Sequence, residues 1–294
     1  MYLQEFLDYL ELERHYSKHT LEAYARDLDQ FIAYLEEEMV DDIKEVNYSL
    51  IRGWIASLLE DGVTSRTVNR KLSSLKSYFK FLRRTEVLER NPMLQHKSLK
   101  VSKNVQVPFS KEEVFQLLDA PYDVADFESS RDRLMIEMLY VTGIRREEMI
   151  TLKLVDVDVA HGQIKVLGKR NKERYVPMVN SMKKHIQSYL LLREAVTRED
   201  TEEFFITAKG VKIYSSLVYR VVKSYFSKVS LKVKISPHIL RHTFATHLLD
   251  EGADLNAVKE LLGHASLSST QVYTHSSMAA LKGVYSDAHP RSKK

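Results

Sequence analysis

The chain of 294 residues contains no cysteine. Disulfide bonds, thiolate metal sites and cysteine nucleophiles are therefore excluded, and the composition fits a reducing compartment. No stretch approaches the roughly 18 apolar residues of a membrane span. Residues 1–5 also lack the basic start and apolar core of a signal peptide. The sequence thus predicts a cytoplasmic protein that does not contact a membrane.

Motifs of several other chemistries are missing as well. Neither the spacing of a nucleotide-binding P-loop nor the carboxylate cluster of two-metal nucleases occurs. His238 and His242 have the i,i+4 spacing of zinc ligands. Either His247 or His264 would complete such a site, but the glutamate of the His-Glu-x-x-His motif is absent and Arg241 would bring a cation close to the metal. We therefore expect no metal and no cofactor.

Apolar residues are abundant enough for packed cores, since they make up 44% of a chain longer than one typical domain. Helical periodicity extends almost without interruption through residues 1–95. The segment 96–108 shows little periodicity, contains three lysines and reads as a basic linker. We therefore predict a helical domain over 1–95, this linker, and a second domain over 109–294.

Basic residues of the first domain are concentrated in its last helix, whereas residues 1–61 are rich in Asp and Glu. On a helical wheel, Val68, Leu72 and Leu75 share one side of this helix, and the basic residues occupy the adjacent side. A charged face is ordinarily just solvated, but its single sign favours contact with phosphate. The residues predicted to bind DNA here are Arg66, Arg70, Lys76, Lys80 and Arg84.

The second domain combines helices with one small sheet. A capping box at Ser110 to Glu113 predicts the start of its first helix, and a second helix ends at Gly143. Segments rich in β-branched residues follow at 152–158, 163–167 and 174–179. Helices resume from about residue 181. The expected fold class is mainly α, with a small antiparallel β-sheet in the second domain.

A first candidate site lies where Gly143 ends one helix and Arg145 stands near the start of the next. The guanidinium of Arg145 can grip two phosphate oxygens, and Glu148, one turn later, can brace it. Taken alone the signal is weak, because an Arg–Glu pair at i,i+3 is usually a surface salt bridge.

A second candidate is the turn from Gly168 to Arg174, which is basic at Lys169, Arg170, Lys172 and Arg174. By itself it reads as a solvated loop. A flexible turn nevertheless suits a lysine that moves in to protonate a leaving oxygen.

The remaining candidates lie in the last third of the chain. His238 and Arg241 share one face near the N-terminus of a helix, whose free N–H groups favour an anion. His264 follows a glycine, and Tyr273 comes nine residues later. A single His or Tyr is usually structural. Together, however, these residues suit an enzyme that holds a phosphodiester while a phenolate attacks it.

These segments resemble the tyrosine recombinases, also called the phage integrase family, and within them the Xer-type bacterial recombinases. The carrying motifs are TGIR at 142–145 with Glu148, GKRNKER at 168–174, HILRHTFATH at 238–247, LLGH at 261–264 and YTH at 273–275. They occur in the family's order and spacing. Arg146 and Glu147 depart from the apolar and small residues that are common there, which calls the packing around Arg145 into question. The N-terminal helices look like the family's SAM-like core-binding domain.

The resemblance implies a set of roles for these residues. They are Arg145 and Arg241 as the phosphate clamp, His238 as a proton-handling partner, Lys172 as general acid, His264 as a phosphate hydrogen-bond donor and Tyr273 as nucleophile. Two arginines and a histidine supply the charge stabilisation that a metal supplies elsewhere. A 3′-phosphotyrosine intermediate would keep the bond energy, so that rejoining needs no ATP.

A basic helix and a basic linker between two domains suggest a clamp around double-stranded DNA. Lys169, Arg170 and Arg174 are predicted to contribute to it. By resemblance, the tail over 278–285 docks on a neighbouring subunit of a tetramer on two DNA sites, with a second related recombinase and a DNA translocase as family partners. The alternative is a tail that packs on its own domain.

Several biological roles stay open at this point. Compact length and the lack of an added arm-binding domain favour chromosome dimer resolution. The alternatives are an integrase or invertase of a mobile element, a nicking and closing enzyme of the type IB topoisomerase kind, and a non-catalytic DNA-binding regulator.

Overall fold

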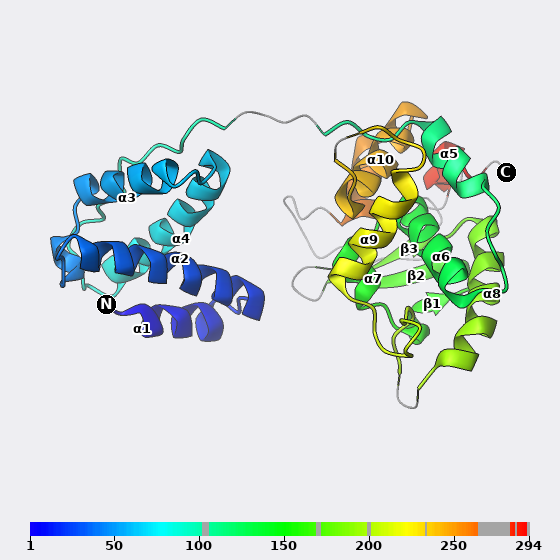
Figure 1. Cartoon of the computed structure of the whole chain (residues 1–294), viewed down its shortest axis with the longest axis horizontal. Coiled ribbons are helices and arrows are strands. Elements are labelled where there is room, and N and C mark those ends of the chain that lie inside the picture. Colours follow the sequence, from blue (N-terminus) through cyan, green and yellow to red (C-terminus); the bar gives the residue numbers. More distant parts are fainter. Residues whose placement is uncertain are drawn as a thin grey trace. The chain divides into compact units, whose positions relative to one another are not determined.

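The structure, a computed structural model, describes residues 1–101, 106–168, 172–198, 201–232, 234–263, 283–285 and 287–292. The chain forms two compact units, Met1–Asn104 and Val105–Lys294 (Figure 1). Within the described ranges, no helix is long and apolar enough to cross a lipid bilayer. The predicted fold class, mainly helical with one small antiparallel sheet, is confirmed.

The first unit packs its helices around an aromatic core. Its elements are α1 (Leu3–Asp8), a π-helical turn η1 (Tyr9–Glu13), α2 (Lys18–Glu37), a 3-10 turn η2 (Ile43–Glu45), α3 (Tyr48–Glu60) and α4 (Ser65–Arg84). Asn47 and Thr64 cap α3 and α4, because their side chains accept hydrogen bonds from backbone N–H groups of the first turn. In the core, the ring of Phe31 meets that of Trp54 edge to face at 4.9 Å between centroids.

Helices α2 and α4 are joined by one buried carboxylate. Asp27, 1% exposed, accepts two hydrogen bonds from Arg70, at 2.5 and 2.8 Å, one from Lys71 at 3.3 Å and one from Ser74 at 2.8 Å. The two oxygens of Asp27 are thereby fully used. The apolar face that the sequence predicted for α4, with Val68, Leu72 and Leu75, is buried.

Replacement of Asp27 by alanine is expected to lower the free energy of unfolding of the first unit by about 2–3 kcal/mol. The charge of the buried Lys71 would lose its partner, whereas the half-exposed Arg70 would regain water. Amide hydrogen exchange of α4 in the full chain measures the effect. Asp29→Ala, at an exposed position of the same helix, is the control. Equal protection in both variants would contradict this role.

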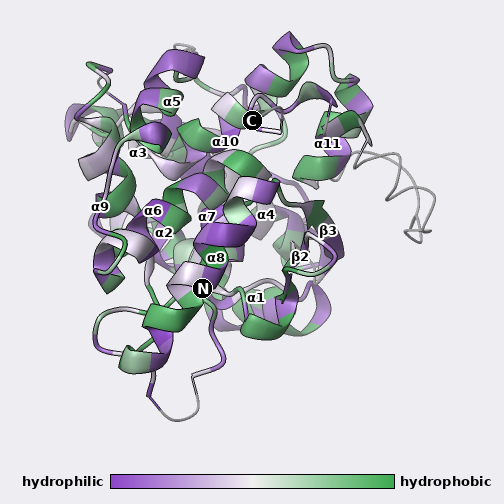
Figure 2. Cartoon of the chain, turned by 90° about the vertical axis from the view of Figure 1, so that its right-hand side faces the viewer, coloured by the Kyte–Doolittle hydropathy of each residue, from purple (hydrophilic) through white to green (hydrophobic). Residues whose placement is uncertain are grey.

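The second unit surrounds one central helix. Its elements are α5 (Lys111–Asp119), α6 (Phe127–Thr142), α7 (Arg146–Ile150), the 3-10 turn η3 (Leu154–Asp156), β1 (Val157–Asp158), β2 (Gln163–Leu167), β3 (Glu173–Pro177), α8 (Asn180–Val196), α9 (Ser215–Phe226), α10 (Pro237–Asp250) and α11 (Leu255–Leu262). Helix α6 packs against α8, α9 and α10, and all of its residues from Ser130 to Thr142 except Asp132 are buried. Figure 2 shows hydrophilic and hydrophobic residues alternating along α8, as expected of a helix with one buried face.

The three strands form an antiparallel sheet in the order β1-β2-β3. Ile164 pairs with Val176 and Val166 pairs with Arg174. The predicted strand at 163–167 agrees with β2, and the predicted strand at 174–179 overlaps β3. The segment 152–158 is mostly not a strand, because η3 takes up 154–156 and leaves only the two residues of β1.

Helix α10 holds the residue that follows the linker. This residue is Phe109, whose backbone N–H donates a hydrogen bond to Thr243 Oγ1 at 3.0 Å. The carbonyl oxygen of Phe109 accepts a hydrogen bond from His247 Nε2 at 2.9 Å. His247 Nδ1 therefore accepts from the hydroxyl of Tyr140, at 3.0 Å. Burial lowers the pKa of His247. Both ring nitrogens have structural partners, so His247 does not fit the zinc alternative.

The described part of the C-terminal segment packs on its own unit. The buried hydroxyl of Tyr285 donates to the carbonyl of Val141 at 2.9 Å, and His289 stacks on the Tyr285 ring at 4.9 Å. Arg291 forms an ion pair with Asp119. Most of the predicted tail helix, over 278–282, lies outside the described residues.

Candidate active site

The first arginine of the site stands at the junction of α6 and α7. Gly143 ends α6 with a φ of 60°, and a Cβ atom there would lie 2.3 Å from the ring of Phe244, so that only glycine fits. Arg145 then caps α7, and its backbone N–H donates to Glu148 Oε2 at 2.7 Å. This turn directs the side chains of Arg145 and Glu148 to the same place.

The guanidinium of Arg145 is held along two directions. Nη1 donates to Glu148 Oε1 at 2.7 Å, and Nη2 donates to the carbonyl oxygen of Gly263 at 3.1 Å. About a third of the side chain stays exposed. The sequence-predicted brace between Glu148 and Arg145 is present in the structure.

Arg241, on α10, lies beside Arg145. Its Nη1 donates to the carbonyl of Gly143 at 2.7 Å and its Nη2 to that of Leu262 at 2.5 Å. Burial and the neighbouring charges of Arg145 and Arg174 lower the pKa of Arg241 to about 10. The group therefore stays protonated at neutral pH, but the repulsion raises its affinity for an anion.

The position of Arg174 differs from the one predicted for the basic turn. The sequence suggested an exposed residue that binds DNA, whereas the side chain is buried on β3. Its Nη1 and Nη2 donate to both oxygens of Glu148 at 2.8 and 2.9 Å. Burial alone would raise the pKa of Glu148, but the hydrogen bonds and charges of Arg174 and Arg145 lower it to about 2.

The cluster carries an excess of positive charge. Three guanidinium groups surround one carboxylate, so the net charge of the group is +2 at neutral pH. The bonds of Arg145 and Arg241 to the protein use one hydrogen on each terminal nitrogen. Among the described residues, the second hydrogens have no acceptor. Two fixed forks of this kind are suited to the non-bridging oxygens of a phosphodiester.

The other predicted site residues are either exposed or lie outside the described residues. His238, in the first turn of α10, and Lys172, directly before β3, are exposed. The backbone carbonyl of Lys172 closes the hairpin, because it accepts from the N–H of Gly168 at 2.7 Å. His264, Tyr273, Lys169 and Arg170 lie outside the described residues.

The basic residues predicted on α4 are all exposed, but two of them have protein partners. Arg70 is bound to Asp27, and Arg84 donates to the hydroxyl of Tyr9 at 3.1 Å. Arg66, Lys76 and Lys80 are exposed on the same helix. Contact of this face with DNA remains a prediction.

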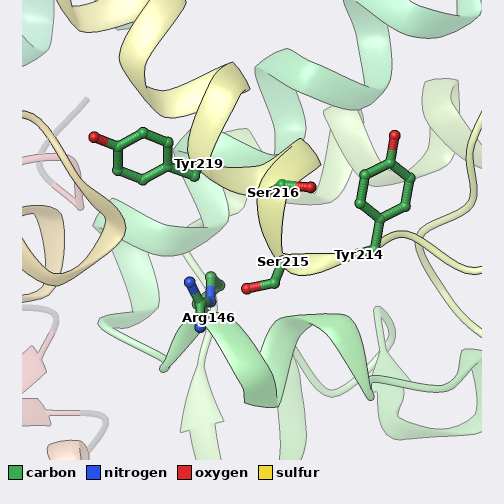
Figure 3. Close-up of a pocket in the computed structure, with 5 residues that line it drawn as sticks. All are labelled: Arg146, Tyr214, Ser215, Ser216 and Tyr219. Carbon is green, nitrogen blue, oxygen red and sulfur yellow. The ribbon is translucent and has the colours of Figure 1, made fainter.

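Sequence reasoning missed a surface pocket between the start of α7 and the start of α9. Arg146 lines it together with residues at the start of α9, namely Tyr214, Ser215, Ser216 and Tyr219 (Figure 3). Nothing in the sequence links 214–219 to Arg146, so only the fold brings them together. Arg146 faces this pocket and forms an ion pair with the exposed Glu147 at 2.8 Å.

A fold of this kind with paired, braced arginines defines a class of enzymes that act on phosphodiesters. Residues 97–280 match the phage integrase family, and residues 3–86 match the phage integrase N-terminal SAM-like domain. The tyrosine recombinase XerC of Oceanobacillus iheyensis is 40% identical, with 99% of this chain and 97% of the relative covered. The tyrosine recombinase XerD of Staphylococcus haemolyticus is 32% identical, with 99% of each chain covered.

The fold is also that of a solved structure, the XerH site-specific recombinase bound to a palindromic difH substrate in a post-cleavage complex. The TM-score is 0.69 at 23% identity, with 93% of this chain and 81% of that chain covered. The chain therefore belongs to the phage integrase family, the tyrosine recombinases, and is an Xer-type enzyme that cleaves and rejoins DNA at specific sites.

Proposed function

We propose that this recombinase binds double-stranded DNA and exchanges strands through a 3′-phosphotyrosine intermediate with Tyr273 as nucleophile. The observation that carries the proposal is the pair Arg145 and Arg241, whose guanidinium groups are bound to the protein on one edge and available to a phosphate on the other. The order of the remaining motifs along the chain supports the roles of the other residues.

The chemistry follows from where charge develops. The phenolate oxygen of Tyr273 attacks phosphorus, and the bond to the 5′ oxygen breaks. Arg145 and Arg241 stabilise the negative charge on the non-bridging oxygens. Lys172 gives its proton to the departing oxygen, which is otherwise a poor leaving group. The reverse steps rejoin the strand and restore the free tyrosine.

His238 and His264 complete the site in this proposal. His238 lies in the first turn of the helix that carries Arg241, and in this proposal it accepts the phenolic proton of the nucleophile. His264 donates a hydrogen bond to the scissile phosphate. Glu148 does not touch the substrate but keeps Arg145 in place.

The basic face of α4 and the linker lysines are proposed to hold the DNA. Arg66, Lys76 and Lys80 are exposed and supply charge to phosphate contacts, which position a protein on a duplex without reading its sequence. The XerH relative whose fold this chain shares was solved on its difH substrate. Arg70 and Arg84 belong to the same face.

Chromosome dimer resolution is the biological role that we propose. The chain aligns over almost its whole length with both XerC and XerD relatives. In this role a tetramer acts on two DNA sites, with a second related recombinase and with regulation by a DNA translocase.

Covalent trapping on nicked DNA tests the reaction. The purified protein is incubated with a suicide substrate that contains the host's presumptive recombination site and is resolved on a denaturing gel. We expect a protein–DNA band, and mass spectrometry of its peptides should find the nucleotide on Tyr273. A band linked to another residue would overturn the assignment of the nucleophile. DNA binding without any band, including with a candidate partner recombinase added, would favour a regulator.

A further inference from the structure

Three consecutive carbonyls at the end of α11 each accept a hydrogen bond from a different arginine. The pairs are Leu261 with Arg174 at 2.9 Å, Leu262 with Arg241 at 2.5 Å, and Gly263 with Arg145 at 3.1 Å. The last carbonyls of a helix have no partner within the helix, and this end carries partial negative charge. The arginine cluster thus closes α11 immediately before His264.

Arg174 differs from the other two arginines in its environment. Only 4% of it is exposed, and all three guanidinium nitrogens donate to protein groups, two to Glu148 and one to Leu261. Because the side chain is buried, it does not present an edge to DNA. A Cβ atom on Gly263 would lie 3.1 Å from Arg174 Nη1, so the end of α11 packs directly on this guanidinium.

The partners of Arg174 are the groups that hold the phosphate clamp. Glu148 Oε1 accepts from both Arg174 and Arg145, so the position of one guanidinium depends on the other. Arg145 contacts both carboxylate oxygens as well, Oε1 through Nη1 and Oε2 through its backbone N–H, and the bidentate pair of bonds from Arg174 fixes the plane of the carboxylate from the other side.

We propose that Arg174 is a positioning residue for strand cleavage, which fixes Glu148 against Arg145 and holds the last turn of α11 on the arginine cluster. The inference rests on the proposed function, because it assigns the cluster to the scissile phosphate. It replaces the DNA contact that the sequence suggested for Arg174 by a role inside the protein.

Single-turnover cleavage of the nicked substrate at saturating protein tests this role. Arg174→Met removes all donors at similar length, and we expect the cleavage rate constant to fall about 100-fold while the Kd for DNA stays within about threefold. Arg174→Lys keeps the charge but cannot reach both Glu148 and Leu261, so its rate constant should lie between those of the wild type and Arg174→Met.

A second buried arginine of the same unit provides the matched control. Arg193 on α8 is 5% exposed and donates to the carbonyls of Phe204 and Glu203 at 3.2 and 2.7 Å. Arg193→Met should lose stability and yet cleave at the wild-type rate per folded molecule. Wild-type cleavage by Arg174→Met would overturn the proposal, as would weaker DNA binding with an unchanged rate constant. If Arg174→Met fails to fold, the lysine variant decides.

NMR titration of the Glu148 carboxyl gives a readout that does not depend on DNA. The pKa of about 2 in the wild type should rise toward 4.5, the value of an unperturbed glutamate, in Arg174→Met and stay unchanged in Arg193→Met. An unchanged titration in Arg174→Met would overturn the coupling even if the protein cleaves none of the DNA tested. Failure of the proposed function and failure of this inference are therefore distinguishable.

Discussion

Replacement of Arg241 by alanine is expected to lower the rate constant of strand cleavage by about 10³- to 10⁵-fold, the range found when an arginine is removed from a phosphoryl-transfer site. The half-buried guanidinium has already lost much of its hydration and faces two other arginines. An anion that approaches this group therefore gains more than it would from a lysine or arginine in water. This stabilisation is greatest when charge accumulates on the phosphate in the transition state.

Arg241→Lys separates charge from geometry. A lysine keeps one positive charge but cannot bind the carbonyls of Gly143 and Leu262 and a phosphate at once. We expect a loss nearly as large as for alanine in single-turnover kinetics, with DNA affinity measured in parallel by anisotropy. Tyr273→Phe provides the reference lane without covalent product. Cleavage by Arg241→Ala within about tenfold of the wild type would remove this residue from the clamp.

Replacement of Glu148 by glutamine is expected to reduce the free energy of unfolding of the second unit by about 3–5 kcal/mol, because it removes one partner of a buried ion pair and leaves the charge of Arg174 uncompensated. Cleavage should fall as well, since Arg145 loses its brace. Glu147→Gln, an exposed neighbour, is the control. Chemical denaturation monitored by near-ultraviolet circular dichroism measures the difference, and equal stability of the two variants would contradict the prediction.

The carboxylate of Glu148 also makes the free energy of unfolding depend on pH. The pKa of Glu148 is about 2 in the folded protein, well below the 4.5 of a free glutamate, so ionised Glu148 favours the folded state. This contribution, about 3 kcal/mol, is fully present above pH 4.5 and is lost as the pH falls toward 2. The stability of the wild type should therefore drop more steeply over this range than that of Glu148→Gln. Parallel curves would show that Glu148 is not a stabilising ion.

Much of this fold could be predicted from the sequence, because helix caps, helix ends and strand bounds are determined by residues close together along the chain. The capping box at Ser110 and Glu113 is present, β2 has the predicted bounds, and Gly143 ends α6. Each signal is a spacing of a few residues that a single turn or strand can express. The candidate arginines and Glu148 could be predicted for the same reason, with the family's motif order to connect them.

Contacts between distant residues could not be predicted in this way. Arg70 looked like a solvent-facing cation, but its partner Asp27 lies 43 positions earlier. Arg174 followed three basic residues in a turn, and local composition does not reveal that a carboxylate from α7 meets it inside the protein. Burial of a charge depends on which elements fold together, and only the structure supplies that.

Hydrogen bonds hold both ends of the linker to the units that it connects. Asn69 on α4 holds Leu99 through two hydrogen bonds of 2.9 Å, and α10 holds Phe109 on both backbone atoms. Only residues 100–108 are left as a tether, and ten peptide steps span at most about 33–36 Å. In the proposed function both units contact DNA, so binding of one unit brings the other to the duplex at an effective concentration on the order of millimolar, whatever the protein concentration in solution.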